Sequence, residues 1–87
     1  MPDRPTPPID FITFTLSLGS SAFMHLGDVP NPESQVFEPN LPLAKQTIDV
    51  LGLLEEKTRG NLTEEEARFL ENLLADLRVR YVQKKGT

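Results

Sequence analysis

The chain has 87 residues, with 9 Lys and Arg against 13 Asp and Glu, a net charge of −4, one His and no Cys. This length allows one domain, and the missing Cys excludes a disulfide framework, Cys-ligated zinc and thiol catalysis. The acidic balance, without any basic run, argues against general nucleic-acid binding. A chain this short, with neither disulfide nor metal, needs very regular helix packing or a partner chain.

The N-terminal segment, residues 1–8, includes four prolines. It has neither the positive start nor the apolar core of a signal peptide. Because proline fixes φ and lacks an amide donor, we expect a disordered, extended arm there. Residues 9–83 are predicted to form a single helical domain, and residues 84–87 a flexible C-terminus.

The first predicted helix covers residues 10–26, with Asp10 as its N-cap and Gly27 as its stop. The sequence from 11 to 27 has no Asp, Glu, Lys or Arg. Apolar side chains cover an arc of about 200° on a helical wheel, and small hydroxyl residues fill most of the remainder. An ordinary surface helix has a narrower apolar stripe with charges opposite it, so we expect this helix to be buried on most sides.

The next segment, residues 28–40, contains Pro30, Pro32 and Pro39. It is predicted to be a loop, and its length is unusual for a compact domain. Val36 and Phe37 lie within this loop, and we expect them to anchor it on the core.

The second predicted helix covers residues 41–58. Asn40 is its expected N-cap, and Pro42 falls in the first turn, where proline is tolerated. Gly60 is the expected left-handed residue after its end. One face of this helix carries mostly apolar residues: Leu43, Ala44, Thr47, Ile48, Val50, Leu51 and Leu54.

The third predicted helix covers residues 63–83 and opens with a capping box formed by Thr63 and Glu66. Acidic residues in its first turn and basic residues near its end complement the helix dipole. Its apolar face consists of Ala67, Phe69, Leu70, Leu73, Leu74, Leu77 and Tyr81. Since no period-2 strand pattern occurs, we predict an all-α fold, with the second and third helices in an antiparallel hairpin and the first packed across it.

Three segments carry a family resemblance: DFITFTLSLGSSAFMHLGDVPNP, NLPLAKQTIDVLGLLEEKTRGNLTEEE and LENLLADLRVRYV. In this order they resemble a family of small bacterial proteins known only as domain of unknown function 1844. The resemblance runs from about residue 10 to residue 82. It implies a small, helical, bacterial and cytoplasmic protein, and it implies no activity, cofactor or catalytic residue.

The candidate polar site consists of His25 and Asp28, three residues apart at the end of the first helix. One interpretation is half of a metal site or a His–carboxylate acid/base pair. The interpretation we favour is structural: His25 stacks on the core and bonds a loop carbonyl or Asp28. No second His and no Cys exists to complete a metal site, so we expect no cofactor.

Other charged segments have structural interpretations as well. The acidic run at 64–66 is typical of a helix start, and residues 57–61 (KTRGN) are typical of a helix stop. The basic residues between 78 and 85 complement a helix dipole. A membrane span over 11–27 is disfavoured, because a helix of about 26 Å falls short of a hydrocarbon core of about 30 Å.

The most informative feature is a stripe of small residues, Thr15, Gly19 and Ala22, on one face of the first helix. Glycine inside a helix commonly permits close backbone approach. Either a helix of the same chain crosses there, or the first helix of a second chain does, and the wide apolar arc favours the second chain. The candidate interface is Phe11, Thr15, Leu18, Gly19, Ala22, Phe23 and Leu26.

A three-helix monomer would also leave Leu16, Phe23 and Met24 on one edge of the first helix, and Phe14 on the other, partly exposed. We therefore expect a homo-oligomer, most simply a two-fold dimer. The hypothesis for function is a non-enzymatic interaction or oligomerisation module that contacts itself or another protein. The alternatives are an enzyme that uses His25 and Asp28, and a membrane-peripheral protein that docks through its first helix.

Overall fold

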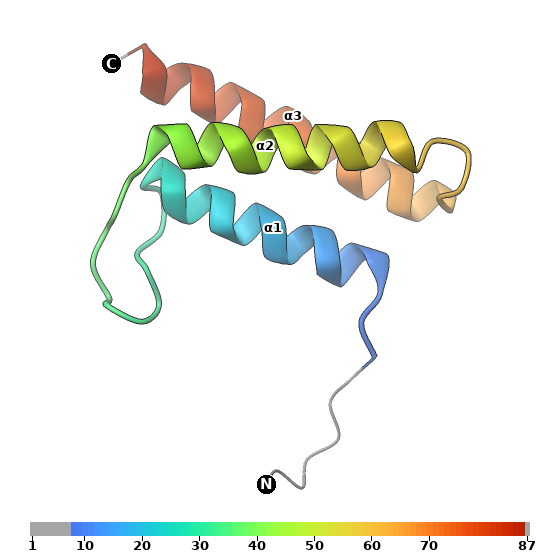
Figure 1. The fold of residues 1–87 in the computed structure, drawn as a ribbon, viewed down its shortest axis with the longest axis horizontal. Coiled ribbons are helices and arrows are strands. Elements are labelled where there is room, and N and C mark those ends of the chain that lie inside the picture. Colours follow the sequence, from blue (N-terminus) through green and yellow to red (C-terminus); the bar gives the residue numbers. More distant parts are fainter. Residues whose placement is uncertain (1–7, 87) are drawn as a thin grey trace, which may run out of the picture.

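The computed structural model describes residues 8–86, and these form three helices in chain order (Figure 1). They are α1 (Phe11–Leu26), α2 (Leu41–Lys57) and α3 (Glu64–Lys85). The all-α fold class is confirmed. The predicted N-terminal arm lies, except for Pro8, outside the described residues. α3 continues two residues beyond its predicted end, so that Lys84 and Lys85 are helical.

Each helix begins directly after the N-cap residue that the sequence predicts. The carboxylate of Asp10 accepts a hydrogen bond from the amide of Thr13 at 2.7 Å, and this bond lowers the pKa of Asp10. Asn40 accepts from the amide of Leu43 in the same way at 3.1 Å. At the start of α3, Thr63 forms the predicted capping box, so that all three first turns have a side-chain acceptor.

The ends of α1 and α2 are each followed by a glycine in a left-handed conformation. Gly27 closes α1 with φ +84°, and its amide donates to the carbonyl of Met24. Gly60, in the turn between α2 and α3, has φ +90°. Both values lie in the left-handed region that glycine tolerates best.

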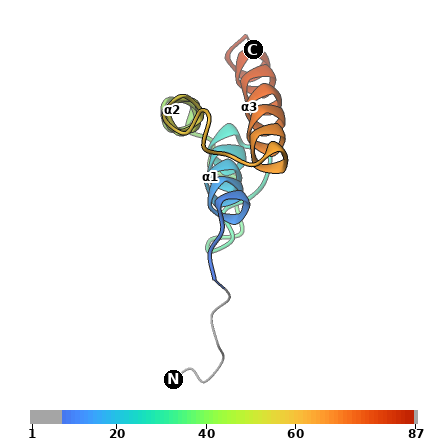
Figure 2. The ribbon, with the colours of Figure 1, turned by 90° about the vertical axis from the view of Figure 1, so that its right-hand side faces the viewer.

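The three helices pack as a bundle in which each contacts the other two. In Figure 1, α2 and α3 run in opposite directions and α1 runs against α2. The view along the bundle in Figure 2 places α1 below and between α2 and α3. The predicted hairpin of α2 and α3, with α1 packed across it, is therefore confirmed.

The core is aliphatic and receives a row of residues from each helix at intervals of three or four positions. None of these side chains is more than 5 % exposed. The core residues are Ala22, Leu26, Ala44, Ile48, Leu51, Leu70, Leu74 and Leu77. Packing of a hydrophobic row from every helix explains why residues 11–57 and 64–85 fold together, since short isolated helices are marginal in water.

The stripe of small residues in α1 faces the core of its own chain. Thr15, Gly19 and Ala22 are buried, and a Cβ atom placed on Gly19 would lie 2.9 Å from Cδ1 of Leu73 in α3. The prediction that a second chain crosses at Gly19 is therefore wrong. The same-chain alternative holds, because the missing side chain lets α3 approach α1 closely.

The loop between α1 and α2 is held by its own polar residues. Glu38 accepts hydrogen bonds from Ser34 at 2.7 Å and from Asn31 at 3.0 Å, and both lower its pKa. Val36 is 52 % exposed and Phe37 is 61 % exposed. The expectation that these two side chains anchor the loop on the core is therefore wrong, and hydrogen bonds within the loop order it instead.

Candidate functional site

The structure does not pair His25 with Asp28. The carboxylate of Asp28 lies beside α3, where its two oxygens contact Arg80 at 3.2 Å and Lys84 at 3.1 Å. The imidazole of His25 is half-buried and makes no hydrogen bond or ion pair with another described residue, while its backbone carbonyl accepts from the amide of Asn40. The acid/base pair of the alternative interpretation is therefore not formed in this geometry. The favoured interpretation is wrong in its hydrogen bond, because the imidazole of His25 bonds neither Asp28 nor a loop carbonyl.

Asp28 instead belongs to an ion-pair network that ties the end of α1 to α3. Arg80 bonds Asp76 through Nε at 3.0 Å and lies over the ring of Phe23, with Cζ 5.2 Å from the ring centre. The hydrogen bonds to Asp76 and Asp28 raise the pKa of Arg80. We call Asp28, Arg80 and Lys84 the Asp28 clamp. Because 52 residues separate Asp28 from Arg80, helical spacing gives no signal of this contact.

The Asp28 clamp is expected to stabilise the fold measurably. The side chain of Asp28 is only 18 % exposed, so Asp28→Asn should lower the thermal unfolding midpoint by about 2–5 °C. Asp49→Asn is the matched control, because it breaks the exposed Lys45–Asp49 pair within α2 and should cost less than about 2 °C. Circular dichroism measures both midpoints. Equal shifts in the two variants would contradict a specific role for the Asp28 clamp.

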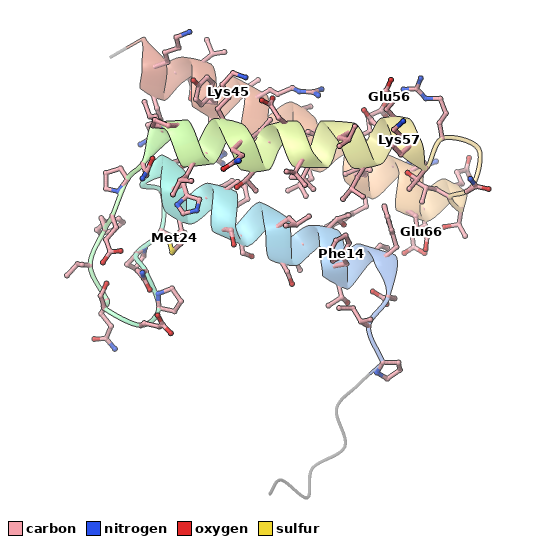
Figure 3. All side chains as sticks on the ribbon, in the orientation of Figure 1. Phe14, Met24, Lys45, Glu56, Lys57 and Glu66 are labelled. Atoms are coloured by element: carbon pink, nitrogen blue, oxygen red, sulfur yellow. The ribbon has the colours of Figure 1, made fainter. Side chains whose placement is uncertain are left out.

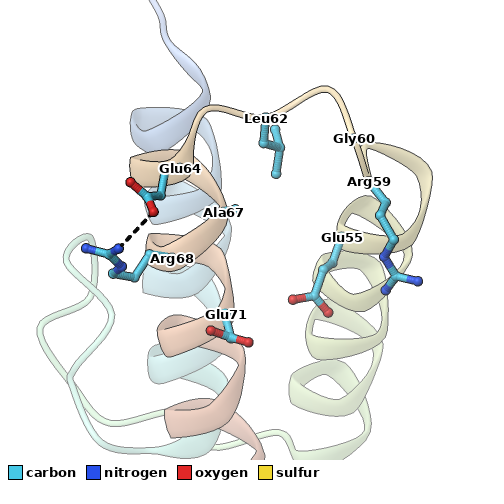
Figure 4. A pocket seen from close by; sticks show the side chains of 8 residues that line it. All are labelled: Glu55, Arg59, Gly60, Leu62, Glu64, Ala67, Arg68 and Glu71. Atoms are coloured by element: carbon cyan, nitrogen blue, oxygen red, sulfur yellow. Dashed lines mark ion pairs between the residues drawn. The ribbon is translucent and has the colours of Figure 1, made fainter.

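A wide hollow lies where α2 ends and α3 begins (Figure 4). Its rim carries carboxylates on Glu55 and Glu71 and the guanidinium of Arg59, while Glu64 and Arg68 pair with each other at 3.5 Å. This mixture of charges favours neither an anion nor a cation. Within residues 8–86 no group of three His, Cys, Asp or Glu side chains is placed to hold a metal ion.

The outward face of α1 is the feature that sets this helix apart. We define it as the exposed residues of α1, none of which is charged: Thr13, Phe14, Leu16, Ser17, Ser20 and Ser21. Phe14 is 41 % exposed and Leu16 is 48 % exposed. Figure 3 shows Phe14 and Met24 toward opposite ends of α1, whereas the labelled residues of α2 and α3 are charged.

The seven candidate interface residues do not form this face. Four of them are buried in the core of the chain: Thr15, Gly19, Ala22 and Leu26. The other three, Phe11, Leu18 and Phe23, are partly buried and pack against that core. The expectation of partly exposed side chains does hold for Phe14 and Leu16, and the signal for it was the width of the apolar arc.

A second hollow, of about 490 Å³, adjoins the C-terminal end of the outward face of α1. Ser20, Ser21 and Met24 line it from the helix, and the loop lines it with Val29, Pro30, Asn31, Pro32 and Glu33. We call it the α1–loop hollow. Its walls are largely apolar and offer room for a side chain from outside the chain.

The family model described as a domain of unknown function, DUF1844, matches residues 8–83. The chain belongs to the DUF1844 family. This description states no activity, so it assigns no role to either hollow or to the Asp28 clamp. A search of curated proteins gave no match, and a search of solved structures gave none either. Among the described helices, none has the length and apolar character needed to cross a membrane.

Proposed function

We propose that this member of the DUF1844 family is a non-enzymatic protein–protein interaction module, which works in the cytoplasm and is contacted through the outward face of α1. One observation carries the proposal: every exposed residue of α1 is uncharged, and Phe14 and Leu16 among them are large and apolar. Exposed apolar surface of this kind commonly marks a site of contact with another molecule.

The two alternative functions find less support in the described residues. An enzyme that uses His25 and Asp28 would need the Asp28 carboxylate free to act, and both of its oxygens contact cations at 3.1–3.2 Å. A membrane-peripheral protein would gain from Lys or Arg around its apolar face. The outward face of α1 has none, and the net charge of −4 opposes binding to anionic lipid.

A photo-crosslinker placed at Ser17 tests the proposal. The Ser17 side chain is exposed at the middle of the outward face and bonds only the carbonyl of Thr13 in its own helix, so benzoylphenylalanine there leaves the core intact. Irradiation of intact cells should give a covalent protein adduct. The same probe at exposed Asn72, on α3, is the control and should give none. Absence of an adduct at Ser17, or equal yields at both positions, would contradict the proposed function.

A further inference from the structure

We infer that the partner of the outward face of α1 is a second copy of this chain, with the two α1 helices packed antiparallel across a two-fold axis. This inference rests on the proposed function and names its partner. Three properties of the described residues carry it: the distribution of charge, the direction of α1, and the position of the α1–loop hollow.

The absence of charge makes a second copy an acceptable occupant. In a two-fold dimer the same surface meets itself, so each charged group in the contact needs an opposite charge of the other copy in register. The exposed residues of α2 and α3 include Lys45, Glu56 and Glu71, and surfaces of this kind repel their copies unless such opposite charges lie in register. The outward face of α1 has no charged residue. A chain with a net charge of −4 can therefore meet its copy there without like charges at the centre of the contact.

The helix dipole selects the antiparallel direction. Parallel helices side by side place like partial charges together at both ends, whereas antiparallel helices place opposite ones together. If the two-fold axis passes the middle of α1, its first residue lies level with the last residue of its copy. Ser17 then lies level with Ser20 of the other copy, and Thr13 level with Met24.

The α1–loop hollow gives the antiparallel pair a complementary fit. In this arrangement Phe14 of one copy lies level with the C-terminal half of the other α1. On a helical wheel Phe14 and Ser21 lie toward the same edge of the outward face. Phe14 therefore meets the α1–loop hollow beside Ser21 and Met24. Each copy contributes one exposed aromatic side chain and one largely apolar hollow, so the dimer contains two equivalent contacts of this kind.

The size of the contact indicates a weak dimer. A helix of 16 residues is about 24 Å long and about 10 Å wide, so one face offers about 240 Å². A standard interface buries about 800 Å² on each partner. Even with the loop beside it, this contact is small. We therefore expect a reversible dimer that dissociates in the micromolar range.

Sedimentation equilibrium over a hundredfold concentration range tests self-association. The wild-type mass should rise from 9.8 kDa toward twice that value. Ser17→Glu and Ser17→Arg should each raise the dimer Kd by at least about tenfold, because either charge would be buried at the contact. Asn72→Glu adds one charge to the outer side of α3 and should leave the Kd unchanged. Circular dichroism verifies that all four proteins are folded.

Disulfide trapping tests the direction, and the chain has no native Cys to interfere. Thr13→Cys mixed with Met24→Cys should give a mixed covalent dimer after mild oxidation, since these positions lie level in the antiparallel pair. Thr13→Cys alone should not form a dimer efficiently, because the two Thr13 positions lie about 16 Å apart along the axis. Efficient trapping of Thr13→Cys with itself, and not with Met24→Cys, would overturn the antiparallel arrangement.

The outcomes separate this inference from the proposed function. A wild-type chain that stays at 9.8 kDa, or a Kd that neither Ser17 variant changes, overturns the second copy as partner. If the Ser17 photo-adduct then contains a different protein, the proposed function still stands. If no adduct forms at all, the proposed function fails too. An adduct that contains two copies of this chain supports both.

Discussion

Leu74→Ala is expected to lower the free energy of unfolding by about 2–5 kcal/mol. Leu74 is 1 % exposed and belongs to the core cluster that draws residues from all three helices. Truncation removes buried methyl groups and leaves a cavity that the surrounding helices fill only in part. Domains of this kind have total stabilities of about 5–15 kcal/mol, so one such cavity is a large fraction of the whole.

Urea unfolding followed by circular dichroism at 222 nm measures this loss. The matched control is Leu53→Ala on α2, because Leu53 is 53 % exposed and alanine has a high helix propensity. We expect that control to change the free energy of unfolding by less than about 0.5 kcal/mol. Similar losses in the two variants would show that the helices do not share the core described here.

Gly19→Leu is expected to destabilise the chain by about 1–3 kcal/mol or more. A Cβ atom at this position would lie 2.9 Å from Cδ1 and 3.0 Å from Cδ2 of Leu73, so a leucine side chain has no room where α3 crosses α1. Gly19→Ala is the graded comparison. Its gain in helix propensity of about 0.8–1 kcal/mol offsets the small displacement of Leu73, and we expect stability close to that of the wild type.

The reason for this loss can be checked by a second substitution. Leu73→Ala opens space opposite Gly19, so the double variant should recover part of the stability that Gly19→Leu loses. A coupling of about 0.5–3 kcal/mol in the double-mutant cycle is expected for residues in contact. A Gly19→Leu protein more stable than the wild type would instead mean that Gly19 faces solvent.

The helices were predictable because their signals are local. Asp10, Asn40 and Thr63 each place an acceptor oxygen where a first turn needs one, and Gly27 and Gly60 supply left-handed residues after the first two helices. Each of these signals depends on residues within a few positions of one another. The core rows follow from helical periodicity, which is equally local.

The contacts between helices were not predictable in the same way. The sequence shows that Gly19 needs a close neighbour, but only the packing identifies Leu73 of α3 as that neighbour. Asp28 looked like a partner for His25, three residues away, and instead pairs with Arg80 across the bundle. Which distant residues meet depends on how three helices rotate against each other, and a single sequence carries no local signal of that rotation.

For the candidate site too, the local features were predictable and the packing between helices was not. The wide apolar arc of α1 is a property of sequence alone, and it led directly to the expectation of a contact surface. Which residues form the surface was predicted wrongly, because the stripe at Thr15, Gly19 and Ala22 faces inward. The exposure of Phe14 and Leu16 was predicted from the apolar arc, but the extent of the outward face became evident only once α2 and α3 were in place.

The most direct test of the account is a dilution series of two-dimensional NMR spectra on ¹⁵N-labelled wild-type chain. If a second copy binds the outward face of α1, the amide shifts of Thr13, Ser17 and Ser20 should change with concentration. Those of Asn72 and Val79, exposed on α3, should not. Shifts that stay constant throughout the chain, or that change on α3 and not on α1, would contradict self-association through this face.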